Sequence, residues 1–574
     1  MKRFATLRVR LLATALILSI TGFAFLYTVH PTRADSASFE TLQSLKANAD
    51  DDPIAADDGA PANNVPNATG QHDNGHRGNV FANDPCLDPL ATAPAPANRR
   101  ATVQSETTIG VLRRGGSKDI VVGYNDSFGF FDNTQGLTGF AYSVDGGQSF
   151  VDGGALPPLV KAPNGPFLAP GADWFLGDPV LAVDQKSGTF YYASLYEDLG
   201  GHQTVSVSRG HFAVAPPSTP ESNSNTRCAG HPELQGVPDT TNLPALRPVW
   251  EPPVVAVNNL GPGDALDKEW IFVNQQTGEL YITYTRFNGD GSTPLELVRS
   301  TDGGHTFTAP TTIVPNLNDT FNQATQPVVT PSGRVIVSYI ARTFADGGAG
   351  PEDENRIEVA VSNDDGATFS TPIVVARVNP EAEPLGYNRG RRSILNAPFI
   401  TVNDETGAVY LTYFNGKTPL VNPDGTIFLG PLARAGDILL STSTDGGSSW
   451  GTPVKVNDDA GTTSHVFPSV QVNDENVFVG WIDRRLDPAN QLTNEWADVS
   501  HDGGHTFGAD QVESDVATTW NVRADARPNF GDYNSSALVG GRLALVWADG
   551  RFGQPAGSAA TPDTIFTVAT GLGD

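Results

Sequence analysis

The chain has 574 residues, including 60 glycines and 43 prolines, and only 17% of its residues are charged. This composition suits many short strands joined by turns, and the length allows a large core or several domains. The formal net charge of −28 argues against nucleic acids and anionic membrane surfaces as partners, since both are also negatively charged.

The first 34 residues have the features of an export signal. Four basic residues within the first ten precede an apolar run from Leu11 to Tyr27. Thr32 and Ala34 then supply the small residues that a cleavage site requires. We therefore expect a secreted or cell-surface protein in which residues 1–34 are either a cleaved signal peptide or a retained membrane anchor.

Residues 35–98 are rich in Ala, Asp, Asn and Pro and show neither helical nor strand periodicity, which predicts a disordered spacer. The two cysteines, Cys86 and Cys228, lie in this spacer and in a Pro-rich insertion at about 212–267. In an exported protein a single disulfide between them is one interpretation, and two unpaired cysteines is the other.

From residue 99 onward a strand pattern recurs. Apolar, β-branched and aromatic runs that end in polar residues predict buried strands. There are seven of them, at Asp119–Asp126, Phe190–Glu197, Leu280–Phe287, Val335–Arg342, Val409–Phe414, Val477–Arg484 and Leu543–Asp549. A further strand is predicted after each, at Phe140–Val144, Thr204–Ser208, Leu295–Ser300, Ile357–Ser362, Ile438–Ser443, Trp496–Ser500 and Ile565–Ala569.

Five of these later strands run into the same motif, S-x-D-x-G-x-x-[FW]. It occupies Ser143–Phe150, Ser300–Phe307, Ser362–Phe369, Ser443–Trp450 and Ser500–Phe507. The Asp carboxylate can accept hydrogen bonds from backbone N–H groups that follow it, and the Gly can adopt a positive φ. The motif therefore predicts a tight turn with a buried aromatic ring, while Ser208-Arg209-Gly210 looks like an eroded copy.

The motif resembles the Asp-box, or BNR, repeat of the sialidase superfamily, whose members are β-propellers. The resemblance covers about residue 99 to the C-terminus and implies an all-β propeller of four-stranded antiparallel blades. The seven predicted units favour seven blades, with six, the number in catalytic sialidases, as the alternative. Because the last unit lacks a fourth strand, we expect the N-terminal segment Arg99–Val103 to supply it and close the ring.

In a propeller, the starts of the first strands and the ends of the second strands share one face, around the central channel. Sialidases use an arginine triad, a Tyr nucleophile paired with a Glu, and an Asp acid/base. By their positions on this face, the resemblance implies Asp178 as the catalytic acid/base and Glu269 as the partner of the nucleophile Tyr533. It also implies a substrate-binding triad of Arg286, Arg342 and Arg484.

Three further substrate-binding candidates, Asp267, Trp270 and Asp532, break the repeat pattern. Sialidases usually carry an Arg-Ile-Pro motif before the first box, whereas the corresponding region here reads Glu106-Thr107-Thr108-Ile109. The assignment thus depends on predicted position. Asp483 with Arg485, and Asp549 with Arg551, are predicted to form structural ion pairs between blades.

Two functions remain open from the sequence. One is an exo-sialidase-like glycoside hydrolase acting on terminal sialosides or related glycosides, and the other is a non-catalytic cell-surface propeller that binds a glycan or a protein. We expect a monomer with a glycan or glycoprotein ligand, no nucleic acid, and membrane contact only through the N-terminal segment. No cofactor or metal is expected; the turns Asn403–Glu405 and Asn457–Asp459 offer oxygen ligands for calcium but lack a full ligand set.

Overall fold

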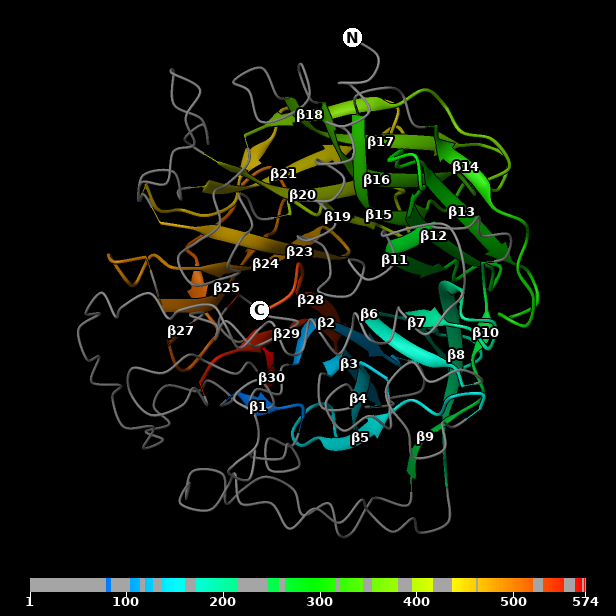
Figure 1. Ribbon diagram of the computed structural model, residues 1–574. Helices are drawn as coiled ribbons and strands as arrows, with labels where there is room; N and C mark the ends of the chain where they lie inside the picture. The colour runs from blue at the N-terminus through cyan, green and yellow to red at the C-terminus, as the bar shows by residue number, and fades with distance from the viewer. Residues whose placement is uncertain are drawn as a thin grey trace, which may run out of the picture.

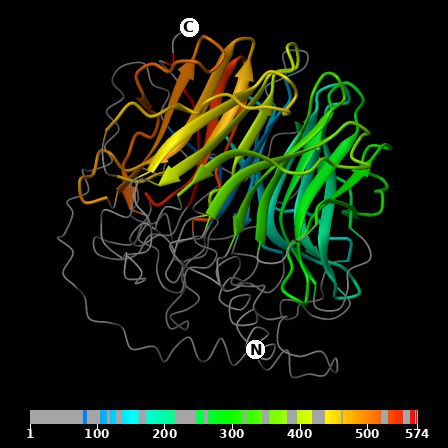
Figure 2. The same cartoon turned by 90° about the horizontal axis from the view of Figure 1, so that it is seen from above.

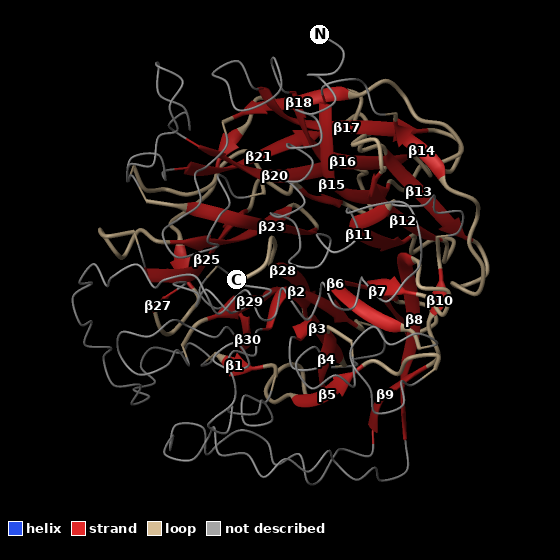
Figure 3. Cartoon of the chain, viewed as in Figure 1, coloured by secondary structure: helices blue, strands red, loops and turns tan. Residues whose placement is uncertain are grey.

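The computed structural model places seven antiparallel sheets in a ring around a central axis, with the inner strand of each sheet next to those of its two neighbours (Figure 1). The structure describes residues 79–83, 104–113, 119–126, 136–160, 172–214, 246–257, 264–315, 320–343, 354–379, 395–416, 436–460, 463–490, 492–519, 530–551, 563–569 and 572. Every element found in these ranges is a strand (Figure 3). Within them there is no helix with the length and apolar character needed to span a membrane.

The first four blades follow one another along the chain. Blade 1 contains β2 (Gln104–Val111), β3 (Ile120–Asp126), β4 (Thr138–Ser143) and β5 (Val151–Ala155). Blade 2 contains β6 (Trp174–Asp184), β7 (Thr189–Glu197), β8 (Gln203–Val214) and β10 (Val254–Val255), and β9 (Leu246–Trp250) also pairs with β8. Blade 3 contains β11 (Ala265–Val273), β12 (Leu280–Phe287), β13 (Leu295–Ser300) and β14 (Thr311–Val314). Blade 4 contains β15 (Thr320–Val329), β16 (Val335–Thr343), β17 (Glu354–Ser362) and β18 (Ile373–Val378).

The remaining blades complete the ring. Blade 5 contains β19 (Phe399–Val402), β20 (Val409–Gly416), β21 (Gly436–Ser443) and β22 (Val454–Lys455). Blade 6 contains β23 (His465–Asn473), β24 (Asn476–Asp483), β25 (Leu492–Ser500) and β26 (Gln511–Val512), and β27 (Thr518–Thr519) also pairs with β25. Blade 7 contains β28 (Ser535–Val539), β29 (Arg542–Asp549) and β30 (Asp563–Val568), and its fourth strand is β1 (Val80–Phe81).

The seven-blade prediction is confirmed, as are the second strands β3, β7, β12, β16, β20, β24 and β29. These strands are buried along almost their whole length because a sheet packs against each of their faces. The strands run from one face of the disc to the other (Figure 2). This placement brings the start of every first strand and the end of every second strand to one face, as expected.

An N-terminal strand closes the ring, but not the one predicted. In β1, Val80 pairs with Phe566 of β30, so the position expected for Arg99–Val103 is already taken, and the described part of the segment 35–98 belongs to a blade. Residues 99–103, like Cys86, Cys228 and residues 1–34, lie outside the described residues. Arg551 fixes the closure, since its guanidinium donates to Asn79 Oδ1 at 3.0 Å.

The five repeated motifs form the same turn. In the first copy, Ser143 Oγ accepts from Gly147 N at 2.9 Å and donates to Asp145 Oδ1 at 2.8 Å. Asp145 also accepts from the backbone N and the hydroxyl of Ser149. These hydrogen bonds to the ionised form, together with those from Ser143 and Gln148, outweigh the effect of burial and lower the pKa of Asp145. The predicted turn is therefore confirmed.

Arginines of preceding blades attach to three of these turns. Arg299 and Arg334 donate to backbone carbonyl groups in the turns of the next blades, Arg334 to Asp445 O at 2.9 Å. Arg209 donates in the same way to Gly303 O at 3.2 Å. The segment Ser208-Arg209-Gly210 is not itself a turn, because β8 continues through it to Val214. The residues of the eroded copy therefore belong to β8, and Arg209 among them contacts the turn of the next blade.

The turn glycines allow a matched stability test. Gly147 has φ +83°, and a Cβ there would lie 2.1 Å from the Phe566 ring of blade 7; Gly154 has φ +69° and no heavy atom within 4 Å of a Cβ. We expect Gly154→Ala to cost about 1–2 kcal/mol for the backbone conformation alone. Gly147→Ala should cost about 1–3 kcal/mol more because of the clash. Urea unfolding followed by tryptophan fluorescence measures both, and equal losses would contradict the packing between blades 1 and 7.

Candidate functional site

The inner strands share an irregularity near the axis. Their register with the second strand shifts at a two-residue bulge between Ser105 and Thr108, between Gly177 and Val180, and between Asp267 and Trp270. The first residue of each bulge has positive φ: 52° for Glu106, 54° for Asp178 and 51° for Lys268. Ala324 and Phe467 have the same conformation at the bulges of blades 4 and 6, so this bulge recurs in the fold, at a cost of about 1–3 kcal/mol for each non-glycine residue.

Lys268 lies at the centre of the group that these bulges present. Its ammonium is 2.7 Å from Asp178 Oδ2, 3.0 Å from Glu106 Oε1 and 3.1 Å from Asp532 Oδ2. Burial alone would lower the pKa of Lys268, but the surrounding carboxylates, Asp178 first, outweigh it and raise the pKa. We call Glu106, Asp178, Asp267, Lys268, Glu269, Asp532 and Tyr533 the axial cluster; each is at most 4% exposed.

Further hydrogen bonds fix the orientation of the carboxyl groups. Asn125 donates to Glu106 Oε2 at 2.8 Å and accepts from Asp178 N at 2.7 Å, so it bridges the bulges of blades 1 and 2. Gln323 of blade 4 donates to Asp267 Oδ2 at 2.8 Å. The cluster is therefore held rigidly by side chains of several blades.

The cluster has five carboxyl groups and one ammonium, so it cannot be fully ionised in a buried site. Burial, followed by the charge of Asp178, raises the pKa of both Glu106 and Glu269 well above the usual value. Burial also raises the pKa of Asp267 to about 6 and raises the pKa of Asp178, and Lys268 opposes the rise at both groups. Burial therefore favours the neutral acid form in this cluster, above all for Glu106 and Glu269.

Glu269 differs from the other acids of the cluster. Both of its carboxyl oxygens are buried and have no hydrogen-bond partner among the described residues, and the side chain is 1% exposed. Leaving such a group unpaired in a protein interior is costly, and unpaired buried polar groups need an explanation. Glu269 is thus the member with free capacity to donate or accept a proton.

Tyr533 and Trp270 form the aromatic border of the cluster. The Tyr533 hydroxyl donates to Pro179 O at 3.0 Å, and burial, followed by Glu106 and Asp178, raises the pKa of Tyr533 well above its usual value. The phenol therefore stays protonated, whereas a nucleophilic role would require its ionised form. The Trp270 ring makes edge-to-face contacts with Tyr533 at 5.5 Å and with Phe399 at 5.2 Å between centroids.

The structure brings together Asp178, Asp267, Glu269, Trp270, Asp532 and Tyr533 from the sequence-based candidates. It does not show Arg286 in the cluster. Arg286 donates from Nε and Nη2 to Glu296 Oε2 at 2.9 and 2.7 Å, and Nη1 lies 3.2 Å from Asp264 Oδ2. This guanidinium is occupied by carboxylates of its own blade.

The other two arginines of the suggested triad also lie on second strands or their ends. Arg484, 1% exposed, donates to Thr493 Oγ1 at 3.1 Å and to Asn490 O at 2.7 Å in its own blade. Arg342 is half-buried on β16, opposite Phe321 in the strand register. Arg286 and Arg484 thus make these contacts within their own blades and not with the axial cluster.

In each of the two Trp-x-Asp-x-Arg segments the Asp and the Arg pair within one blade, while Arg551 also pairs with Asp515 of blade 6 at 2.9 Å. Trp481 Nε1 donates to Asp483 Oδ2 at 2.9 Å, and Arg485 Nε donates to the same oxygen at 2.7 Å. Asp549 accepts from Trp547 and from Arg551 in the same arrangement. The two predicted ion pairs are therefore present, but their predicted place between blades is wrong, because the Asp and the Arg of each pair are two residues apart at one strand end.

No group of His, Cys, Asp and Glu among the described residues has an arrangement that could hold a metal ion. In the turn Asn403–Glu405, the Asn403 side chain accepts from Glu405 N and Thr406 N. In the turn Asn457–Asp459, Asp458 pairs with Arg485 at 2.7 Å. Asn403 and Asp458, two of the suggested calcium ligands, therefore have partners within the protein.

Sequence reasoning assigned no role to Glu106 or to Lys268. Both are the first residue of a bulge, and Lys268 belongs to a segment that was singled out for breaking the repeat. Their mutual contact spans 162 positions of the sequence and has no local signal.

Neither a protein-family model nor a curated protein sequence matches the chain. Among solved structures, the fold is similar to an ulvan lyase of polysaccharide lyase family PL25, with TM-score 0.43, 12% identity and coverage of 82% of this chain and 94% of that one. A Hadza microbial sialidase gives TM-score 0.36, 13% identity and coverage of 78% and 76%. Trypanosoma rangeli sialidase in complex with sialic acid gives TM-score 0.41, 13% identity and coverage of 74% and 59%. The class that fold and site define is a seven-bladed β-propeller with a buried carboxyl cluster at its axis.

The role of Lys268 predicts a pH-dependent loss of stability. Lys268→Met leaves the buried carboxylates without their cation and should cost about 3–5 kcal/mol of unfolding free energy near neutral pH. Protonated carboxyl groups need no cation, so the loss should be smaller at about pH 5 than at about pH 8. Urea unfolding at both pH values checks this, with Lys186→Met, at an exposed turn, as the matched control. An equal loss at both values would contradict the ionic role.

His465 predicts a second pH effect, in blade 6. Its Nε2 lies 3.1 Å from Asp459 Oδ1 and 3.2 Å from Asp483 Oδ2, without the alignment of a hydrogen bond. Burial lowers the pKa of His465, but the two carboxylates outweigh it and raise the pKa to about 9. Because the folded value exceeds the unfolded one, this stability is fully present below about pH 6.5 and is lost as the pH rises through about 9.

We therefore expect the unfolding free energy of the wild type to fall by about 3 kcal/mol between these pH values on account of this group. His465→Gln should remove that part of the slope, as measured by denaturant unfolding across the range. Parallel curves for the wild type and the variant would show that His465 is not protonated in the folded protein.

Proposed function

We propose that the protein is an exported, glycan-directed enzyme that cleaves glycosidic bonds by proton transfer at the axial cluster. One observation carries the proposal: carboxyl groups from neighbouring blades are buried side by side, burial raises the pKa of each, and Lys268 at 2.7 Å opposes that rise at Asp178. Such an arrangement is typical of acid–base catalysis, in which one carboxyl group stays protonated and another stays ionised. Export is supported by the basic and apolar segment at residues 1–34.

The roles follow from the protonation of each group. Glu269, protonated and without a partner, is suited to donate a proton to the leaving oxygen. Asp178, which Lys268 favours in its ionised form, is suited to stabilise the positive charge that develops on the sugar ring, or to attack the anomeric carbon. Tyr533 stays protonated and donates its one O–H to Pro179 O, which leaves its hydroxyl oxygen as an acceptor, and Trp270 supplies an aromatic face.

The resemblance to sialidases suggests a more specific substrate class, the sialosides. A ligand carboxylate would need cationic partners, and the three N–H groups of Lys268 already face three carboxyl groups. Arg286 is likewise paired within its blade. A broad range of glycosides is therefore the appropriate substrate panel, with an α-sialoside included.

A second candidate function is a propeller that binds a glycan or a protein without catalysis. The near-complete burial of Asp178, Glu269 and Tyr533, at 3%, 1% and 3% exposure, favours it. In that case the axial cluster would serve to join the blades.

Hydrolysis of fluorogenic glycosides by the purified protein separates the two functions. We expect Glu269→Gln to lower kcat by about 100- to 10,000-fold, as is usual for the loss of a general acid. Glu495→Gln is the matched control, because Glu495 is also a buried acid with a raised pKa but lies on β25 in blade 6. Equal activity of Glu269→Gln and the wild type would refute the proposed mechanism. Absence of turnover across the whole panel would favour the binding propeller.

A further inference from the structure

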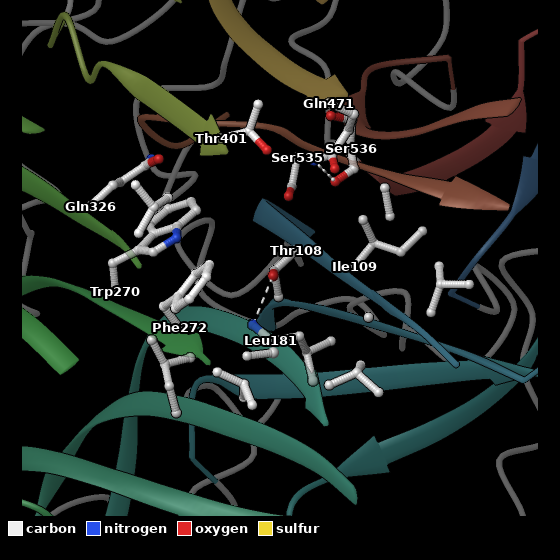
Figure 4. A pocket seen from close by; sticks show the side chains of 18 of the residues that line it. Thr108, Ile109, Leu181, Trp270, Phe272, Gln326, Thr401, Gln471, Ser535 and Ser536 are labelled. Atoms are coloured by element: carbon white, nitrogen blue, oxygen red, sulfur yellow. Dashed lines mark hydrogen bonds between the residues drawn. The ribbon is translucent and has the colours of Figure 1, made fainter. Parts of the chain in front are cut away.

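The inner strands of all seven blades also enclose a cavity along the propeller axis, beside the axial cluster. The axial channel, as we call it, is a cavity of about 230 Å³ lined by β2, β6, β11, β15, β19, β23 and β28 (Figure 4). Its walls come from the later residues of these strands, such as Val111, Val183 and Val273, whereas the cluster comes from the bulges near their beginnings. Trp270 lines the channel and also contacts Tyr533, so it lies between the channel and the axial cluster.

The channel has a different chemistry from the cluster. Among its lining residues only Arg113, near the turn that follows β2, carries an ionisable side chain. The rings of Trp270, Phe272 and Phe399 form one part of the wall. An uncharged ligand is therefore favoured, because a charge would lose its hydration without gaining a partner of opposite sign.

Polar groups face these rings. The hydroxyl groups of Thr401 and Ser535 and the indole nitrogen of Trp270 point toward the middle of the channel (Figure 4). None of the three has a hydrogen bond to another described residue, while Gln326 uses its Oε1 to accept from Ile400 N at 3.2 Å and keeps its amide N–H groups available. The channel thus offers both donors and acceptors next to aromatic faces.

The channel opens on the face opposite to the axial cluster. A second cavity, of about 580 Å³, shares Arg113, Gln185 and Gln275 with it and is also lined by Lys186 and Asp404. These residues lie in or beside the turns between first and second strands. The glutamines stiffen this mouth, since Gln185 donates to Val111 O and Gln275 donates to Val183 O, both at 2.8 Å.

We propose that the axial channel is a second ligand-binding site, which takes one uncharged sugar ring or a polyol of similar size. Aromatic faces suit the C–H surface of a pyranose, and hydroxyl, amide and indole groups suit its hydroxyl groups. The volume lies below the roughly 300–1,000 Å³ of sites for drug-sized ligands, so the ligand is small. The site is separate from the axial cluster and does not depend on the proposed hydrolysis.

Isothermal titration calorimetry on the full chain tests the proposal without turnover. The neutral probes are glucose, galactose and myo-inositol, and the charged counterparts are glucuronate and glucosamine. We expect at least one neutral probe to bind, and the charged counterparts of glucose to bind at least about tenfold more weakly. Thr401→Val should weaken binding by about three- to tenfold, because one neutral hydrogen bond is lost. Thr442→Val, on β21 and equally half-buried, is the matched control and should bind as the wild type does.

Ala537→Leu offers an independent variant, since Ala537 lines the channel and the larger side chain would fill it. We expect it to abolish binding, and a thermal unfolding curve shows whether it folds; if it does not, Thr401→Val carries the test. Absence of binding by every neutral probe would overturn the proposal. Unchanged binding in Thr401→Val, or tighter binding of glucuronate than of glucose, would overturn it as well.

Discussion

The structure depends on one buried cation at the propeller axis. The ammonium of Lys268 in blade 3 contacts Glu106 of blade 1, Asp178 of blade 2 and Asp532 of blade 7, so a single charge joins four blades. The bulges that aim Glu106, Asp178 and Lys268 inward have an unfavourable backbone conformation. Charge pairing in a dry interior offsets that strain, and it leaves more carboxyl groups than one cation can balance.

The excess of carboxyl groups explains how one set of strands can present two chemistries. At the bulges, burial favours the protonated form of Glu269, whose carboxyl oxygens have no hydrogen-bond partner among the described residues, and this supports proton transfer. Further along the same strands the side chains are apolar or neutral and enclose the axial channel. The edge-to-face contacts of Trp270 with Phe399 and Tyr533 divide the axis between them.

The sequence predicted what local pattern determines. Second strands such as Val477–Arg484 and turns such as Ser143–Phe150 are encoded within a few residues, so their form could be read directly. The closing strand could not, because the pairing of Val80 with Phe566 joins the two ends of the chain. Strand position also placed Asp178 and Asp532 correctly on one face, but it could not show that Arg286 turns to Glu296 on the neighbouring strand. Side-chain partners depend on packing rather than on position along the strand.

The most direct test of this account is the protonation of the axial acids themselves. Infrared difference spectra of the wild type and Glu269→Gln at neutral pH detect the carbonyl stretch of a protonated carboxyl group. We predict that one component of this carbonyl signal is present in the wild type and is lost in Glu269→Gln, while Glu495→Gln leaves that component in place. A band for ionised carboxylate lost in its place would contradict the account, because the axis would then lack its proton donor.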